Sequence, residues 1–200
     1  MAELLVEDYT RKGYVDGISI RLPTIVVRPD KFQQPATSTS HLNFLSSMIR
    51  EPLNGQSTVV PVNLDLRHTV ASPQAAVQYL LHAGFVMKAP QEAGDRTLQM
   101  PGVSLTVKEM IQALERVKGN DEATKLIQHK ADPEIMRLVE HWPKELEAKR
   151  ALQLGFVPDK SYDQILNHYM KDFGIPYNSN GDNCEKDTKA DTRKRKSEML

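Results

Sequence analysis

The sequence predicts an α/β protein, and three observations lead to this class. Short runs rich in β-branched residues alternate with amphipathic segments of helical spacing, and residues typical of helix N-caps stand between them. With 200 residues, the chain is long enough for one domain with its own core. The order of the elements carries the prediction, because a hydrophobic content of 40% and a charged content of 26% are ordinary for folded domains.

The chain begins with a predicted helix over residues 2–12. Leu4, Leu5 and Tyr9 recur at helical spacing, and Gly13 is a typical residue to follow a helix C-terminus.

A strand is expected next, over residues 17–22. It should end or bulge at Pro23, because proline has no N–H to donate to a sheet. The β-branched run at 24–27 follows this proline directly. We expect that run to form a loop that either packs under another element or lines a site.

The elements as far as residue 102 follow from the same two periodicities. Ser72 and Pro73 suit the N-cap and the first position of a helix. This part of the chain is expected to contain helices at 41–55 and 73–87 and strands at 57–62, 64–72 and 95–102.

The second half is predicted to be mostly helical. Thr106 and Glu109 form a capping box, and the helix that follows should end at Gly119. Asp132 and Ser161 are expected to be N-caps. The elements expected here are helices at 107–118, 133–142, 144–154 and 162–173 and a strand at 125–130.

The end of the chain differs in composition. Residues 178–200 are rich in charge and almost free of apolar side chains, so they cannot bury enough surface to order themselves. We therefore expect a folded part at 1–177 and a disordered tail at 178–200. The basic run at 193–196 is expected to be solvated rather than a nuclear signal.

Composition argues against several classes of partner. The 26 acidic and 26 basic residues cancel, which gives no general electrostatic reason to expect nucleic acid or an anionic membrane. No apolar run approaches the roughly 20 residues that span a bilayer. The N-terminus lacks the apolar segment of a signal peptide, and the single cysteine, Cys184, excludes an internal disulfide. We expect a cytoplasmic protein.

Most chemical motifs are absent from these 200 residues. There is no P-loop, H-E-x-x-H, C-x-x-C or G-x-S-x-G, and no histidine stands three or four residues from another. No catalytic residue and no metal ligand are therefore predicted. A structural role is favoured for every histidine, including His68, which lies in an expected strand beside Arg67.

Two arginines, Arg28 and Arg67, stand within or just after apolar runs. A cation is costly there unless it is paired, and arginine in such places often binds a carboxylate or phosphate through two hydrogen bonds. The alternative is an arginine that faces water or an internal acid. The residues alone leave both readings open.

Several blocks of sequence resemble a known family. They are "GISIRLPTIVVRP", "FLSSMIREPLNG", "LRHTVASP", "LQMPGVSLTVKEMIQALERV" and "LGFVPDKSYDQI". Over residues 2–173 the chain resembles the C-terminal half of extended short-chain dehydrogenases/reductases, the NAD-dependent epimerase/dehydratase family. Within that family it is most similar to the D-erythronate dehydrogenase-like branch.

The resemblance implies a fold, a cofactor and a substrate class. It implies the distal part of a Rossmann-type doubly wound sheet, followed by a mostly helical substrate-binding part. The implied cofactor is NAD, with Pro23, Thr24, Ile25 and Val26 against its nicotinamide end. The implied substrate is a sugar acid such as D-erythronate, bound by Arg67 and Arg28.

The chain departs from the family pattern in its catalytic residues. The family uses a glycine-rich phosphate loop and a Tyr-x-x-x-Lys pair, and none of the six tyrosines here is followed by lysine four residues later. The resemblance thus implies an oxidoreductase that is inactive as this chain alone. The alternative is a non-catalytic binding or interaction protein derived from the family. In either case a homo-oligomer or another partner is expected to cover the face where the sheet is incomplete.

Overall fold

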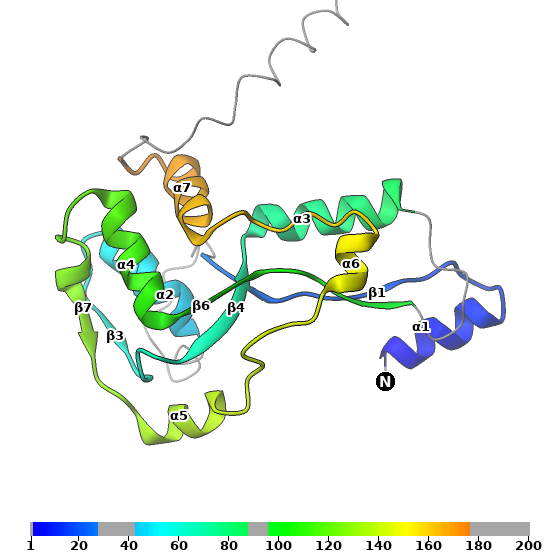
Figure 1. Ribbon diagram of the computed structural model, residues 1–200, viewed down its shortest axis with the longest axis horizontal. Helices are drawn as coiled ribbons and strands as arrows, with labels where there is room; N and C mark the ends of the chain where they lie inside the picture. The colour runs from blue at the N-terminus through cyan, green and yellow to red at the C-terminus, as the bar shows by residue number, and fades with distance from the viewer. Residues whose placement is uncertain (1, 28–42, 88–95, 177–200) are drawn as a thin grey trace, which may run out of the picture.

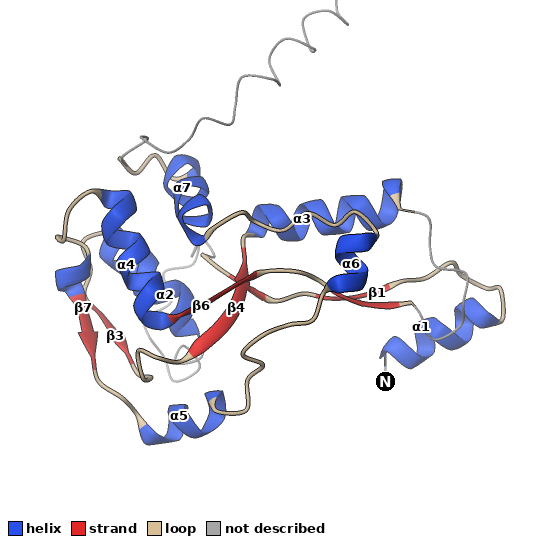
Figure 2. Ribbon diagram, viewed as in Figure 1, coloured by secondary structure: helices blue, strands red, loops and turns tan. Residues whose placement is uncertain are grey.

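The computed structural model describes residues 2–27, 43–87 and 96–176. Helices and strands alternate through the first half of the chain, so the predicted α/β class is confirmed (Figure 2). The helices are α1 (Ala2–Arg11), α2 (Phe44–Leu53), α3 (Pro73–Leu81), α4 (Val107–Lys118), α5 (Pro133–Val139), α6 (Lys149–Gln153) and α7 (Tyr162–Asp172). The strands are β1 (Ser19–Arg21), β2 (Thr24–Ile25), β3 (Thr58–Val60), β4 (Arg67–Ala71), β5 (Thr97–Gln99), β6 (Val103–Thr106) and β7 (Ile127–His129).

The described strands form three small sheets. Strands β1 and β5 pair in parallel, as do β3 and β7. The third sheet has the order β2-β4-β6, in which β2 and β4 are parallel and β4 and β6 are antiparallel. In Figure 1 the β1–β5 pair lies toward the end of the molecule that carries α1, and the β3–β7 pair lies at the opposite end.

Pro23 marks the point where the chain changes from one sheet to another. Before it, the N–H of Ser19 donates to the Arg96 carbonyl, 2.8 Å away, in the pairing with β5. After it, Thr24 and Ile25 pair with β4. The expectation of a loop was therefore wrong for Thr24 and Ile25, whereas the next two valines lie beyond the strand and pack into the larger core cluster, as one of the two alternatives had it. A proline lacks the N–H that would continue the first ladder, yet the β-branched residues behind it suit a new one.

The helix starts agree with their sequence signals. The Ser72 hydroxyl accepts a hydrogen bond from the Ala75 N–H at 2.9 Å, and both halves of the capping box between Thr106 and Glu109 are formed. The expected N-caps at residues 132 and 161 are also present. Helix α3 continues into a π-helical turn at His82–Val86, so the helical run extends nearly as far as expected.

Two expectations in the second half were wrong. Strand β6 was not expected, and the helix expected at 144–154 is confined to Lys149–Gln153. The physical reason for the second difference is tertiary. The carbonyl of Lys144 accepts hydrogen bonds from the hydroxyls of Thr69, at 3.2 Å, and Ser104, at 3.1 Å. These bonds hold the segment against β4 and β6 in a non-helical conformation.

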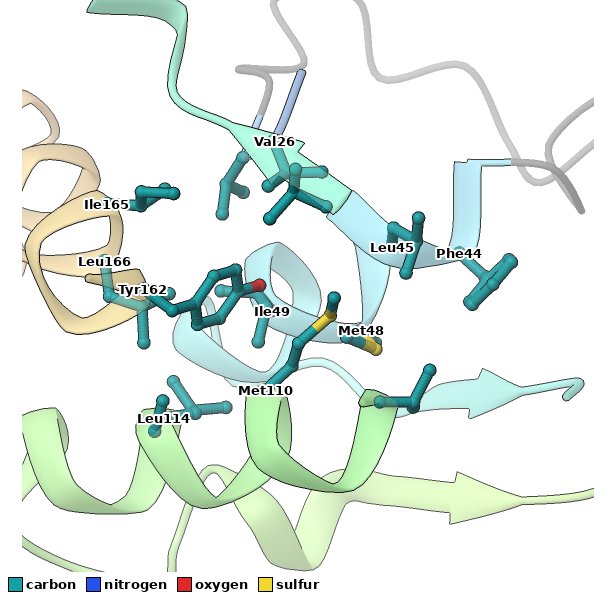
Figure 3. Close-up of a cluster of buried hydrophobic side chains, with 14 of the residues drawn as sticks. Val26, Phe44, Leu45, Met48, Ile49, Met110, Leu114, Tyr162, Ile165 and Leu166 are labelled. Atoms are coloured by element: carbon teal, nitrogen blue, oxygen red, sulfur yellow. The ribbon is translucent and has the colours of Figure 1, made fainter. Parts of the chain in front are cut away.

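The core consists of two clusters. The larger one gathers side chains from α2, α4 and α7, as Figure 3 shows for Met48, Met110, Leu114 and Leu166. The smaller cluster joins β4, α3, β5 and α6, with Tyr79 and Phe156 as its largest members. The predicted tail at 178–200 lies outside the described residues.

Candidate functional site

The four residues expected to contact a cofactor lie at the start of the β2-β4-β6 sheet. Pro23 is buried, and Thr24 and Ile25 of β2 are partly exposed. Val26 is fully buried in the larger core cluster, so it offers no surface to a ligand in this structure. Arg28, expected at the substrate, lies outside the described residues.

Thr24 is held by His68. The Thr24 hydroxyl and His68 Nε2 are 2.6 Å apart, and His68 is only 6% exposed. The sheet register explains the contact, because Thr24 lies opposite Val70, and His68 precedes Val70 by two residues on the same strand. Residues two apart on a strand share a face, so His68 and Thr24 are diagonal neighbours.

Trp142 covers the imidazole ring of His68. The two ring centroids are 4.9 Å apart, and Trp142 also stacks with Phe44, with ring centroids 6.3 Å apart. Trp142 lies just beyond the end of α5 rather than within the helix expected there. The residues Thr24, His68, Trp142 and Phe44, called the threonine–histidine cluster below, are thus joined by hydrogen bonding and ring contacts across 118 residues of chain.

The environment of His68 favours the neutral imidazole. Burial lowers the pKa of His68 below its usual value of 6.5, and the backbone at Pro143 opposes this shift only in part. In the unfolded chain, His68 therefore binds a proton as the pH falls through about 6.5, whereas in the folded chain it stays neutral to a lower pH. The neutral His68 therefore contributes fully to the free energy of unfolding above pH 6.5. This contribution is lost as the pH falls toward the lower pKa of His68 in the folded state.

The titration of His68 should be visible in Trp142 fluorescence, because this is the only tryptophan of the chain. We expect the emission of the folded protein to change with a midpoint below pH 6.5, as protonation puts a cation against the indole ring. We also expect the midpoint of urea unfolding to decrease as the pH is lowered through this range. The variant H68Q should lose both pH effects, and a fluorescence midpoint above 6.5 would contradict the assignment.

Arg67 has partners within the fold. Its Nη1 donates to the Ser104 carbonyl at 3.1 Å, and its Nη2 lies 3.5 Å from Glu109 Oε2, while 38% of the side chain remains exposed. The sequence left open whether Arg67 binds a ligand or instead faces water or an acid of the protein itself. The contact with Glu109 supports the pairing with an acid of the protein. Because side chains alternate along a strand, Arg67 leaves β4 on the opposite face from His68. The structure therefore brings Thr24 to His68 and not to Arg67.

A pocket of about 250 Å³ lies elsewhere in the fold. It is formed by α3, α7 and residues 155–159, with His82, His168 and three glutamine side chains in its wall. None of the predicted site residues lines it, so it does not coincide with the site inferred from the sequence.

Other kinds of site find no basis in the described residues. Within 2–27, 43–87 and 96–176, no group of three or more His, Cys, Asp or Glu side chains is placed to hold a metal ion. Of the helices in these ranges, none combines the length and the apolar character needed to cross a membrane.

Sequence reasoning missed most of the threonine–histidine cluster. The sequence presents His68 only as a neighbour of Arg67 in an expected strand, and it places Trp142 at the end of the helix expected at 133–142. The alternation along 64–72 did place His68 on the same face as Val70. What the sequence lacked was the register between β2 and β4, which sets Thr24 beside that face.

Comparison with curated proteins finds similar dehydrogenases. Two D-erythronate dehydrogenases, from Haemophilus influenzae and Cupriavidus necator, are each 39% identical to this chain, over 86% and 88% of its length. The chain spans about half, 52%, of each of these relatives. No protein-family model matches the chain.

Comparison with solved structures agrees with this. A nucleoside-diphosphate-sugar epimerase from Agrobacterium tumefaciens is 42% identical, with a TM-score of 0.77 over 87% of this chain and 49% of its own. An L-threonine dehydrogenase from Phytophthora infestans has a TM-score of 0.65 over 86% of this chain and 52% of its own. At 18% identity the second structure supports the fold alone. Together these matches confirm the predicted resemblance.

Proposed function

Because this chain resembles D-erythronate dehydrogenase-like extended short-chain dehydrogenases/reductases over about half of their length, we propose that it forms one half of such an oxidoreductase. The proposed reaction is NAD-dependent oxidation of a sugar acid such as D-erythronate. The observation that carries this proposal is the 39% identity to two dehydrogenases of that name.

The described residues supply only part of the proposed NAD site. The partly exposed Thr24 and Ile25 are able to contact a nicotinamide ring, and His68 fixes the direction of the Thr24 hydroxyl. NAD, when bound, would accept the hydride. The 200 residues contain no glycine-rich phosphate loop and no Tyr-x-x-x-Lys pair, so the phosphate contacts and the proton transfer need groups from outside this sequence.

Arg67 is the proposed contact to the substrate carboxylate. Its guanidinium is partly exposed, and its approach to Glu109 at 3.5 Å is long for a charge-assisted hydrogen bond. An exposed pair of this kind contributes little, so a bound carboxylate is able to compete for the same guanidinium. The proposed role of Arg28 rests on the family pattern alone.

The experiment compares the 200-residue chain with a chimera. In the chimera, the half of the Haemophilus influenzae D-erythronate dehydrogenase that has no counterpart here is joined to this chain. NADH formation is measured with D-erythronate as substrate. We expect turnover by the chimera and none by the chain alone above a no-protein control. Turnover by the chain alone would show that the proton-transfer group lies within it, and an inactive, folded chimera would reject the proposed reaction.

The variant R67A tests the substrate contact in that chimera. We expect KM for D-erythronate to rise by roughly 10- to 100-fold, because a charge-assisted hydrogen bond contributes about 1.5–3 kcal/mol. R116A is the matched control, since Arg116 pairs with Asp163 of α7 at 2.8 Å and has no proposed role in binding. If R67A and R116A give the same KM, Arg67 has only the structural role that its bond to the Ser104 carbonyl indicates.

A second candidate is a non-catalytic interaction protein. It is favoured by the large apolar side chains that remain exposed on α1 and α3 of the described chain, together with the absence of a Tyr-x-x-x-Lys pair. The chimera separates the two candidates. An interaction protein would leave the chimera inactive even when the supplied half binds NAD.

A further inference from the structure

The pocket between α3 and α7 is lined by polar side chains from both helices. Gln74, Gln78 and His82 recur every four residues on α3 and the turn that continues it, and Gln164 and His168 have the same spacing on α7. Residues four apart share one face of a helix, so two polar faces line the same pocket of about 250 Å³. Figure 1 shows the segment between α6 and α7, which completes the wall, running along α3.

The inner wall of this pocket is held in place by packing and hydrogen bonds. Phe156 is buried and meets Tyr79 edge to face, with ring centroids 6.0 Å apart. The Tyr79 hydroxyl donates to the Pro101 carbonyl at 2.9 Å, and both oxygens of the buried Asp159 carboxylate accept from Ser72. Because these side chains are already fixed, a ligand enters without the cost of ordering them.

Hydrogen bonds within the fold decide which polar atoms remain for a ligand. Gln74 Nε2 donates to Asp172 Oδ2 at 2.6 Å, which leaves Gln74 Oε1 to accept. Gln164 Oε1 accepts from a backbone N–H just before α7 at 2.8 Å, which leaves Gln164 Nε2 to donate. His82 Nε2 donates to the backbone carbonyl that follows α6 at 2.8 Å, so Nδ1 of the neutral ring is an acceptor.

The remaining atoms suit a small neutral ligand that carries hydroxyl groups. A hydroxyl both donates and accepts, so it matches a wall that offers acceptors and a donor side by side. Among the described residues that line the pocket there is no lysine or arginine, whereas Asp159 adds a negative charge, so an anion is disfavoured. Pockets for drug-sized molecules hold about 300–1,000 Å³. The smaller volume here is that of a site for a single sugar or polyol.

We propose that this pocket, called the glutamine–histidine pocket below, binds a neutral monosaccharide or small polyol through Gln74, Gln164 and His82. His168 adds a contact through Nε2, since its Nδ1 is enclosed and has no hydrogen-bond partner among the described residues. The inference goes beyond the proposed function. None of the residues expected at NAD or at its substrate lines this pocket, and a sugar acid carries the negative charge that the pocket disfavours.

The test is an NMR titration of the 200-residue chain, with the imidazole signals of its histidines as the readout. The probes are erythritol, D-xylose and D-glucose, each compared with the acid on the same carbon skeleton: D-erythronate, D-xylonate and D-glucuronate. We expect a neutral probe to shift the signals of His82 and His168 with a Kd of about 1–10 mM, as suits so small a ligand. The matching acid should bind there at least about tenfold more weakly. The signals of His68 and His129, which do not line the pocket, should stay in place with the neutral probe.

Two variants test the assignment of the wall. Q164L removes the donor and should raise the Kd roughly three- to tenfold, the effect of one hydrogen bond. Q78F places a larger side chain at an exposed position in the wall and should also weaken binding, without loss of a bond within the fold. Q112L is the matched control, because Gln112 is exposed on α4 and does not line this pocket. Unchanged Trp142 fluorescence and unchanged His68 and His129 signals show that each variant remains folded.

Several outcomes would overturn the proposal. They are no shift with any of the three neutral probes at about 50 mM, equal binding of a neutral probe and its acid, and shifts at His68 in place of His82 and His168. Unchanged binding in either Q164L or Q78F would do the same. Because the readout is binding at two histidines outside the proposed NAD site, an active chimera with no shift here would reject this pocket and leave the proposed reaction intact.

Discussion

Replacing Asp159 with alanine is expected to lower the free energy of unfolding by about 3 kcal/mol. The Asp159 carboxylate is 9% exposed and accepts two hydrogen bonds from Ser72, from its N–H at 2.8 Å and from its hydroxyl at 2.7 Å. Ser72 is fully buried, so the variant D159A leaves two of its donors without an acceptor. The same serine caps α3, and the loss should therefore reach the start of that helix.

The measurement is urea unfolding followed by Trp142 fluorescence. D163A is the control, because Asp163 makes an exposed pair with Arg116 and its loss should cost at most about 1 kcal/mol. D159N should fall between D159A and the unchanged chain, since the amide keeps one acceptor oxygen. Equal stability of D159A and D163A would show that the bonds to Ser72 contribute nothing beyond a surface contact.

Replacing Leu114 with alanine is expected to cost about 3–5 kcal/mol. Leu114 lies on the buried side of α4 and is fully enclosed where α2, α4 and α7 meet (Figure 3). Removing three carbon atoms there loses their burial and leaves a cavity that the three packed helices fill only in part. A cost of this size is a large share of the free energy of unfolding of a domain of this length. A fraction of the L114A molecules should therefore be unfolded at physiological temperature.

The matched control is L138A, at a leucine that is 58% exposed on α5. Its free energy of unfolding should stay within about 0.5 kcal/mol of the unchanged chain. Thermal unfolding followed by circular dichroism compares the two variants. If L114A loses less than about 1 kcal/mol, the helices do not enclose this residue as described.

The parts of the fold that the sequence predicted are those with local signals. Ser72, Thr106 and Ser161 hold hydroxyls that bond to backbone N–H groups three residues later, and each begins a helix as expected. Such signals depend on a few neighbouring residues and do not require a particular tertiary arrangement. They also supported the α/β class, because they separate the helices from the β-branched runs.

The parts that could not be predicted depend on pairing between distant residues. Strand β6 forms by antiparallel pairing with β4, in which Ser104 lies opposite Thr69. No local sequence pattern predicts this register. Residues 144–148 include good helix formers. The hydroxyls of Thr69 and Ser104 nevertheless donate to the Lys144 carbonyl and prevent a helix there. The proposed site had the same difficulty, since the contact between Thr24 and His68 follows from sheet register.

Pro23 has a mechanical consequence. Only two residues separate the end of β1 at Arg21 from the start of β2 at Thr24, and three residue steps span at most about 11 Å even when fully extended. This short tether limits how far the β1–β5 pair is able to travel relative to the β2-β4-β6 sheet. Any larger displacement of β1 has to pull on Thr24 and on the imidazole bonded to it. The fluorescence of Trp142, whose indole lies beside the His68 imidazole, would then change when β1 is displaced.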